Sequence, residues 1–260
     1  MWIRTALLSA VVAAAAWGQD AKPTADDLKK KDEDAKEKIA EYKKAMSKAK
    51  ADGDIVANIK TLGETQHPKI LAELKPWLTK QLPALEAAGE AIAKYSKDKE
   101  AAEMLMTAAG GRRDKDGIVK CLRYAGDVGY KGIVSKLCGY FQNRDADIAR
   151  EAVDSCAKLR SREAIDPLIG LYREVDAIKD DPKGGGGSGV GGVGGVGGVA
   201  GGGVGGVQGG NNEERLKRKS TLTPGVQSAL EKISSESKPA TVREWNDWWR
   251  KAKGTFKDPE

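Results

Sequence analysis

The sequence predicts an all-α protein, an α-α superhelix of stacked helical hairpins with a charged N-terminal helix and a disordered glycine-rich insertion. Three observations support this fold class. The chain has 40% hydrophobic residues but only two Phe and 5% aromatics, so its core must be built mainly from Ala, Leu, Ile and Val. Its apolar residues recur at helical spacing between Gly, Pro and charged turns. Similar segments also recur with a period of about 31 to 33 residues, the length of one helical hairpin.

Residues 1–18 have the pattern of a signal peptide. Arg4 gives the positive end, an apolar run extends from Ala6 to Ala16, and small residues precede the polar Gln19. We expect cleavage near Gly18 and export to the periplasm or the outside of the cell. The alternative is an uncleaved anchor, but this run is well short of the roughly 20 residues that span a bilayer. No later stretch is long and apolar enough, so we expect no transmembrane segment in the mature chain.

Residues 19–53 predict a charged helix. Basic and acidic residues are mixed throughout, and Thr24 with Asp27 forms a capping arrangement at the helix start. The apolar residues form a thin stripe with a spacing close to a heptad, as in a coiled coil: Leu28, Ala35, Ile39, Tyr42, Met46 and Ala49. We expect this stripe to pack within the chain, with a partner helix as the alternative.

Residues 54–180 contain the repeats. Four positions recur 63 residues later and three of them recur again 32 residues further on: Ile55, Ile70, Leu74 and Trp77 match Ile118, Ile133, Leu137 and Tyr140, and then Ile165, Ile169 and Tyr172. Four predicted hairpins follow: 54–63 with 68–80, 83–96 with 99–109, 116–126 with 131–142, and 147–159 with 162–175. One such hairpin cannot bury its apolar stripe alone, so neighbouring hairpins must stack into a solenoid.

The unit from Ala146 to Tyr172 resembles a HEAT-type repeat. Its first helix carries Arg150, Ala152 and Val153 in the Arg-x-Ala-Ala/Val arrangement of that family, and its second reads Ala-Ile-Asp-Pro-Leu from Ala164. The resemblance is weaker in the earlier units, where Gly89, Gly110 and Gly111 depart from the pattern. It implies a HEAT-like helical-repeat solenoid of the armadillo type that serves as a binding scaffold, and it transfers no catalytic residue.

Residues 181–222 predict a flexible loop, because 18 of the 27 residues from Gly184 to Gly210 are Gly, mostly in a Gly-Gly-Val repeat. The loop ends in a basic run that includes Arg215, Lys217, Arg218 and Lys219. We interpret this run as a solvated loop end, with contact to an anionic envelope polymer or membrane surface as the alternative. Export argues against a nucleic-acid partner.

Residues 223–260 predict a terminal helical hairpin that completes the solenoid. Thr223-Pro224 would start its first helix, and Thr241 with Glu244 would cap the second. The second helix places its apolar residues on one face: Trp245, Trp248, Trp249, Ala252 and Phe256. We expect this face to bury against Leu230 and Ile233, with an exposed aromatic platform for sugar or peptide binding as the alternative. The Trp245–Trp249 segment also resembles the closing helix of some exported bacterial HEAT-repeat proteins.

Three cysteines and one histidine limit the chemistry. They exclude a multi-histidine metal site and a four-thiolate zinc site. Cys121, Cys138 and Cys156 fall on three successive predicted helices; we expect buried thiols or at most one disulfide, with Cys121–Cys138 on the two arms of one hairpin as the candidate. His67 precedes Pro68 at a helix start, which favours a capping or exposed histidine. We predict no cofactor.

The sequence favours a non-enzymatic, exported helical-repeat scaffold that binds an unidentified protein partner in the cell envelope. The alternative is a structural envelope component that self-associates or contacts wall polymers through the glycine-rich loop. An enzyme built on HEAT-type repeats is a third, less favoured hypothesis.

Overall fold

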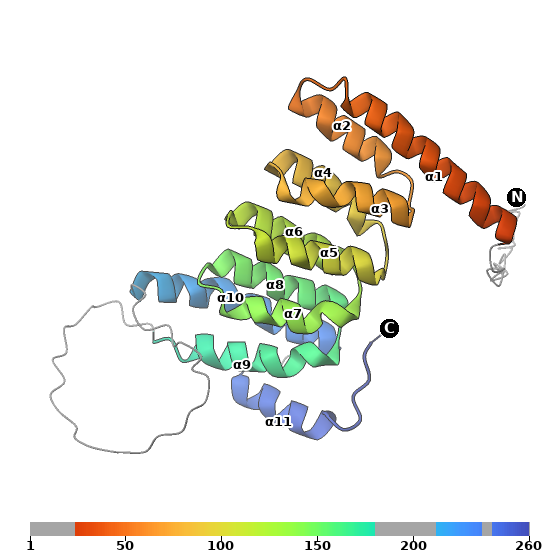
Figure 1. Ribbon diagram of the computed structural model, residues 1–260. Coiled ribbons are helices and arrows are strands. Elements are labelled where there is room, and N and C mark those ends of the chain that lie inside the picture. The colour runs from red at the N-terminus through yellow and green to blue at the C-terminus, as the bar shows by residue number, and fades with distance from the viewer. Residues whose placement is uncertain (1–23, 180–211, 236–240, 260) are drawn as a thin grey trace, which may run out of the picture.

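The computed structural model describes residues 24–179, 212–235 and 241–259, and these residues form helices and turns without a strand (Figure 1). The predicted all-α, helical-repeat fold class is therefore confirmed. The predicted signal peptide, residues 1–18, and the glycine-rich segment, residues 184–210, lie outside the described residues. Within the described ranges, no helix combines the length and the apolar character needed to cross a bilayer.

Eleven α-helices and four short 3₁₀ helices occur in the described ranges. They are α1 (Ala25–Met46), α2 (Asp52–Leu62), α3 (Pro68–Leu74), η1 (Lys75–Thr79), α4 (Leu82–Ala93), α5 (Lys99–Gly111), α6 (Lys115–Val128), η2 (Lys131–Ile133), α7 (Val134–Cys138), η3 (Gly139–Gln142), α8 (Ala146–Leu159), η4 (Arg162–Ala164), α9 (Ile165–Asp176), α10 (Asn212–Ser234) and α11 (Val242–Ala252).

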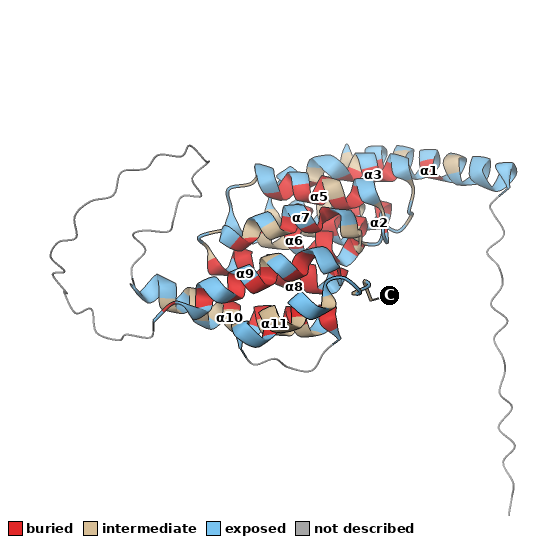
Figure 2. Ribbon diagram, turned by 90° about the horizontal axis from the view of Figure 1, so that it is seen from below, coloured by how far each residue is buried: buried red, intermediate tan, exposed pale blue. Residues whose placement is uncertain are grey.

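The helices form two layers. Helices α2, α4, α6, α8 and α10 pack in sequence as one layer, and α1, α3, α5, α7 and α9 form the other, with α11 against α9 (Figure 1). The second helix of each predicted hairpin packs more extensively on the first helix of the next hairpin than on its own partner, most clearly α5 on α6 and α9 on α10. Buried residues gather where the two layers face each other (Figure 2).

Side-chain caps fix most helix starts. Seven side chains accept a hydrogen bond from a backbone N–H in the first turn of the helix that follows: Thr24, His67, Asp98, Asp114, Asp145, Ser161 and Thr241. Each satisfies an amide that the helix itself leaves unpaired. The capping boxes expected at Thr24 and Thr241 are both present.

The N-terminal helix α1 packs on α2 and α3, while its N-terminal end projects beyond the stack (Figures 1 and 2). Ala35 and Tyr42 of the predicted stripe are buried. The indole Nε1 of Trp77 donates a 2.6 Å hydrogen bond to the Tyr42 hydroxyl, which joins α1 to η1. The stripe therefore packs within the chain from Ala35 onward, whereas Leu28 near its start is 54% exposed.

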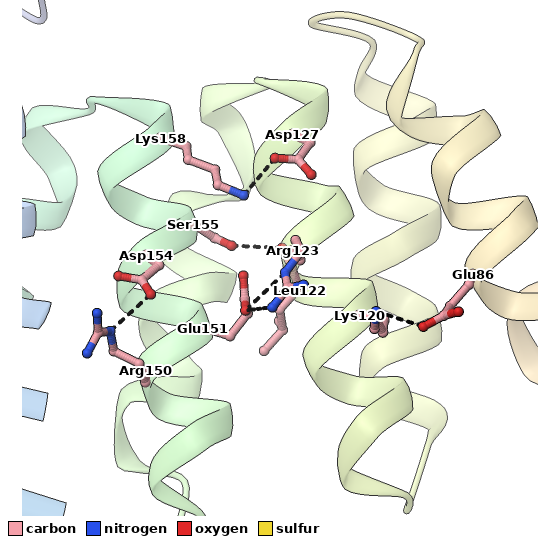
Figure 3. Close-up of polar contacts among 10 residues, drawn as sticks. All are labelled: Glu86, Lys120, Leu122, Arg123, Asp127, Arg150, Glu151, Asp154, Ser155 and Lys158. Carbon is pink, nitrogen blue, oxygen red and sulfur yellow. Dashed lines mark hydrogen bonds and ion pairs between the residues drawn. The ribbon is translucent and has the colours of Figure 1, made fainter. Parts of the chain in front are cut away.

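We call the layer of α2, α4, α6, α8 and α10 the first layer. Ion pairs join neighbouring helices of this layer (Figure 3). They link α4 to α6 through Glu86 and Lys120 at 2.7 Å, and α6 to α8 through Arg123 and Glu151 at 2.8 Å and through Asp127 and Lys158 at 2.6 Å. Each is partly exposed and contributes little stability alone. The paired residues lie 28 to 34 positions apart in the chain, so each pair joins two neighbouring units.

Helices α6 and α8 approach each other closely at Gly126 and Ser155. The buried Ser155 Oγ donates a 2.9 Å hydrogen bond to the Leu122 carbonyl across the interface (Figure 3). A Cβ on Gly126 would lie 2.8 Å from the Ser155 side chain, well inside contact distance. Glycine is therefore required by packing at this position.

The predicted helix over 131–142 is divided. The chain forms η2, then the five-residue α7, then η3 from Gly139. Gly129 ends α6 with a φ of 78°, which glycine adopts without strain. The third repeat therefore has the least regular second helix of the described units.

Helix α10 begins eleven residues before its expected start. It runs from Asn212 to Ser234 and contains Pro224 within it, where the sequence pattern placed the end of a loop and a helix cap at Thr223. It packs against both α8 and α9. The prediction of a loop over 212–222 and of a helix start at Thr223 is therefore wrong.

Candidate functional site

Buried polar side chains in the described residues have structural roles. Glu151 pairs with Arg123, Ser155 bonds the Leu122 carbonyl, and Ser161 accepts a hydrogen bond from the Glu163 N–H at the start of η4. The described ranges contain no group of three or more His, Cys, Asp and Glu side chains that could hold a metal ion.

His67 is the N-cap of α3, as the sequence predicted. Its Nδ1 accepts a 3.2 Å hydrogen bond from the Lys69 N–H, and its Nε2 lies 3.6 Å from an Asp32 carboxylate oxygen on α1. The Tyr95 hydroxyl accepts from the His67 N–H and donates to the His67 carbonyl, both at 3.0 Å. This histidine therefore links α1, α3 and the end of α4.

The tryptophans of α11 form a packed cluster. Trp245 is fully buried, Trp249 is 5% exposed, and Trp248 is half-buried with its ring 5.9 Å from that of Phe256. The Trp249 indole Nε1 donates a 2.7 Å hydrogen bond to Asp166. Core packing is thus confirmed for Trp245 and Trp249, and an open aromatic platform made of all three rings is wrong.

The surface that the cluster covers includes α9 as well as the predicted residues of α10. Helix α11 packs mainly on α9, where Asp166 lies, while Trp245 and Trp249 belong to the same buried cluster as Leu230 and Ile233 of α10. The Lys253 ammonium also binds Asp166 at 2.7 Å and lies over the Trp249 ring. The end of the stack is therefore closed by α11 against α9.

The basic run divides into a buried part and an exposed part. The Arg218 side chain is 11% exposed, and its guanidinium donates to the carbonyls of Phe141 and Asn143 at 2.5 Å. Burial lowers the pKa of this guanidinium. Lys219 donates a 2.8 Å hydrogen bond to the Ile178 carbonyl.

These contacts anchor the N-terminal half of α10 to η3 and to the residues that follow α9. Arg215 and Lys217 are exposed on the same helix. The prediction of a solvated loop end is therefore wrong, because this run is helical. Two of its four predicted basic residues, Arg218 and Lys219, donate hydrogen bonds to backbone carbonyls.

All three cysteines are free thiols. Burial raises the pKa of the Cys121 thiol to about 11, and the nearest charged groups acting on it are Arg112 and Asp114. Cys138 instead hydrogen-bonds Cys156 on α8. The candidate Cys121–Cys138 disulfide is therefore absent, and the expectation of buried thiols holds for Cys121 and Cys156.

Glycines within the helices or at their ends fall into two classes. At Gly63, Gly89, Gly117 and Gly126, an added Cβ would lie under 3 Å from a neighbouring side chain, so close packing explains the glycine. At Gly170, in the middle of α9, no atom of another part of the described chain lies within 4 Å of the position that an added Cβ would take. Internal packing does not explain this second class.

Gly170 belongs to an outward face with short side chains on α5, α7, η3 and α9. The exposed residues Thr107, Gly139 and Gly170 lie 32 and 31 positions apart, one repeat each. Gly139 also has open space around its Cβ position. We call the exposed surface of Thr107, Gly110, Ser135, Gly139 and Gly170 the glycine face.

A hollow of about 480 Å³ adjoins the glycine face between η1 and α5, and it is lined by Lys75, Asp98, Lys99, Glu100, Glu103, Met104 and Thr107. Glu103 also lies 3.8 Å from Lys136 of α7. The first-layer surface carries long, paired charges instead (Figure 3). The glycine face thus offers bare helix backbone beside a hollow bordered by charges of both signs.

No family model and no curated protein sequence matches this chain. Sequence reasoning noted Gly110 and Gly111 only as departures from a repeat pattern. The spacing of one repeat between Thr107, Gly139 and Gly170 was the available signal for the face.

Proposed function

We propose that this protein is an exported, non-enzymatic scaffold of the HEAT-like type that binds a protein partner through the glycine face. The observation that carries the proposal is Gly170, a mid-helix glycine facing open space on a surface where successive repeats also expose short side chains. A glycine inside a helix costs about 1 kcal/mol relative to alanine. A partner that approaches the helix backbone closely requires a residue without a side chain, which would explain a glycine here despite that cost.

The stacked architecture supports a surface of this kind. Each repeat adds one exposed helix turn to the same side, so the face extends over α5, α7 and α9. The hollow beside Thr107 can receive a side chain of the partner, and Lys75, Glu100 and Glu103 can orient its polar groups. Interfaces of standard size combine such a pocket with a polar rim.

The test is a crosslinked pull-down from the cell-envelope fraction with a tagged chain that begins at Gln19. Gly170→Arg places a long side chain on the glycine face, where it has room to fold outward. Gly53→Arg is the matched control, because Gly53 lies in α2 of the other layer and also faces open space. Circular dichroism must show that both variants are as helical as the parent chain.

The proposal predicts one protein that is captured by the parent chain and by the Gly53 variant but lost with the Gly170 variant. Equal capture by both variants would reject the glycine face. Capture of a second copy of this chain alone would favour the structural envelope component instead.

A further inference from the structure

Cys138 and Cys156 form a side-by-side thiol pair between two repeats. Cys138 ends α7, Cys156 lies in α8, and their side chains are hydrogen-bonded to each other. Helices α7 and α8 pack directly against one another. We propose that this pair is a modification site, which a small-molecule disulfide oxidises to a Cys138–Cys156 disulfide that ties α7 to α8.

The two thiols have different chemical roles. Cys138 is half-buried and thus open to a small reagent, whereas Cys156 is fully buried. The hydrogen bond from Cys156 lowers the pKa of Cys138, with burial and the Glu163 carboxylate acting in the opposite direction. The same hydrogen bond and burial raise the pKa of Cys156. Because the thiolate is the nucleophile and Cys138 is the more exposed of the two thiols, Cys138 reacts first.

The exchange has two balanced steps. The Cys138 thiolate attacks one sulfur of the small disulfide, forming a mixed disulfide and releasing one small thiolate. The Cys156 sulfur then attacks the Cys138 sulfur, its proton passes to the released thiolate, and a second small thiolate leaves and takes a proton from water. Two protein thiols are oxidised and one small disulfide is reduced to two thiols.

The position of the bond gives it a structural effect. Helix α7 has five residues and lies between η2 and η3, whose 3₁₀ hydrogen bonds have poorer geometry than those of an α-helix. A covalent bond to α8 would hold this least regular segment against the most extensively packed layer. The bond would close a loop of the seventeen residues between the two cysteines, which restricts the unfolded chain.

Cys121 is the internal control. It is also fully buried, but it lies near Arg112 and Asp114 and not beside another thiol. Its raised pKa keeps it protonated at neutral pH. We therefore expect no reaction at Cys121.

The experiment treats the reduced chain and its Cys121→Ser variant with oxidised glutathione at neutral pH, then alkylates and measures intact mass and peptide maps. Both proteins should lose two hydrogens and yield one linked peptide pair containing Cys138 and Cys156. The Cys156→Ala variant should stop as the glutathione mixed disulfide at Cys138. The Cys138→Ser variant should not react.

The melting temperature supplies a second readout. The bridged chain should melt about 5 to 10 °C above the reduced chain, and the reducing agent should reverse this shift. Three alkylatable thiols after treatment, or a bridge that includes Cys121, would overturn the proposal. A bridged chain that melts with the reduced chain would overturn the tethering of α7 to α8.

Discussion

Gly170→Ala should stabilise the protein, whereas alanine at a closely packed glycine such as Gly126 should destabilise it. The added methyl group meets open space, since no atom from another part of the described chain lies within 4 Å. The gain is then the helix propensity difference, about 0.8 to 1.0 kcal/mol. For a chain of this size, 1 kcal/mol corresponds to a rise in melting temperature of about 2 to 4 °C.

Gly126→Ala is the opposing case. Its Cβ would lie 2.8 Å from the Ser155 side chain and 3.0 Å from the Ser155 Cα, so the α6–α8 interface must open. Overpacking of this kind costs about 1 to 3 kcal/mol, which exceeds the gain in helix propensity. The variant should therefore be less stable than the parent chain.

The free energies of unfolding of the parent chain and the two variants should be measured by urea denaturation at constant temperature. The dependence of this free energy on urea concentration should be the same for all three proteins. A neutral or destabilising Gly170→Ala would refute the reasoning, because it would show that internal contacts already account for the glycine. Stabilisation by Gly126→Ala would show that the close approach of α6 and α8 is misplaced.

Three further predictions concern the contacts that hold the stack together. The Arg112 guanidinium holds the pKa of Asp114 below its usual value. The stability that this carboxylate contributes is therefore present above the unfolded-state pKa of about 3.9 and is lost as pH falls below it. Asp114→Asn should flatten the acid limb of a curve of unfolding free energy against pH. Arg218→Met should cost about 1 to 3 kcal/mol by leaving two backbone carbonyls without their donor, whereas Arg215→Met on the exposed side should change urea stability by less than about 0.5 kcal/mol. Trp245→Ala should cost about 3 to 5 kcal/mol in the same assay, because the indole is fully buried, and a loss below about 1 kcal/mol would contradict its place in the core.

Local sequence signals predicted the parts of the fold that local chemistry determines. The capping boxes at Thr24 and Thr241 and the cap at His67 depend on side chains within three residues of the helix start, so short motifs reveal them. Burial of Trp245 and Trp249 followed from their spacing on one face of a helix.

Long-range packing decided the parts that were missed. The run from 212 to 222 has little apolar character and follows a glycine-rich segment, so it is typical of a loop. This segment is held against the stack by long-range contacts, among them those of Arg218 to carbonyls 75 and 77 residues away in the chain. No pattern near Arg218 indicates those acceptors.

The cysteine pairing was missed for a related reason. The sequence places Cys121 and Cys138 on the two arms of one predicted hairpin. In the stack, the second helix of a hairpin packs more on the first helix of the next one, and Cys138 thereby meets Cys156. The repeat period reveals that units stack, but it does not tell which neighbouring helices share the larger interface.

The most direct test of partner binding through the glycine face is site-specific photocrosslinking in the intact cell envelope. A photoreactive residue at Thr107 would lie on that face, and one at Glu90 would lie on the first-layer surface of α4. The account predicts a discrete crosslinked partner from position 107 and none from position 90. A partner crosslinked from position 90 alone would show that binding uses the opposite surface and would contradict the account.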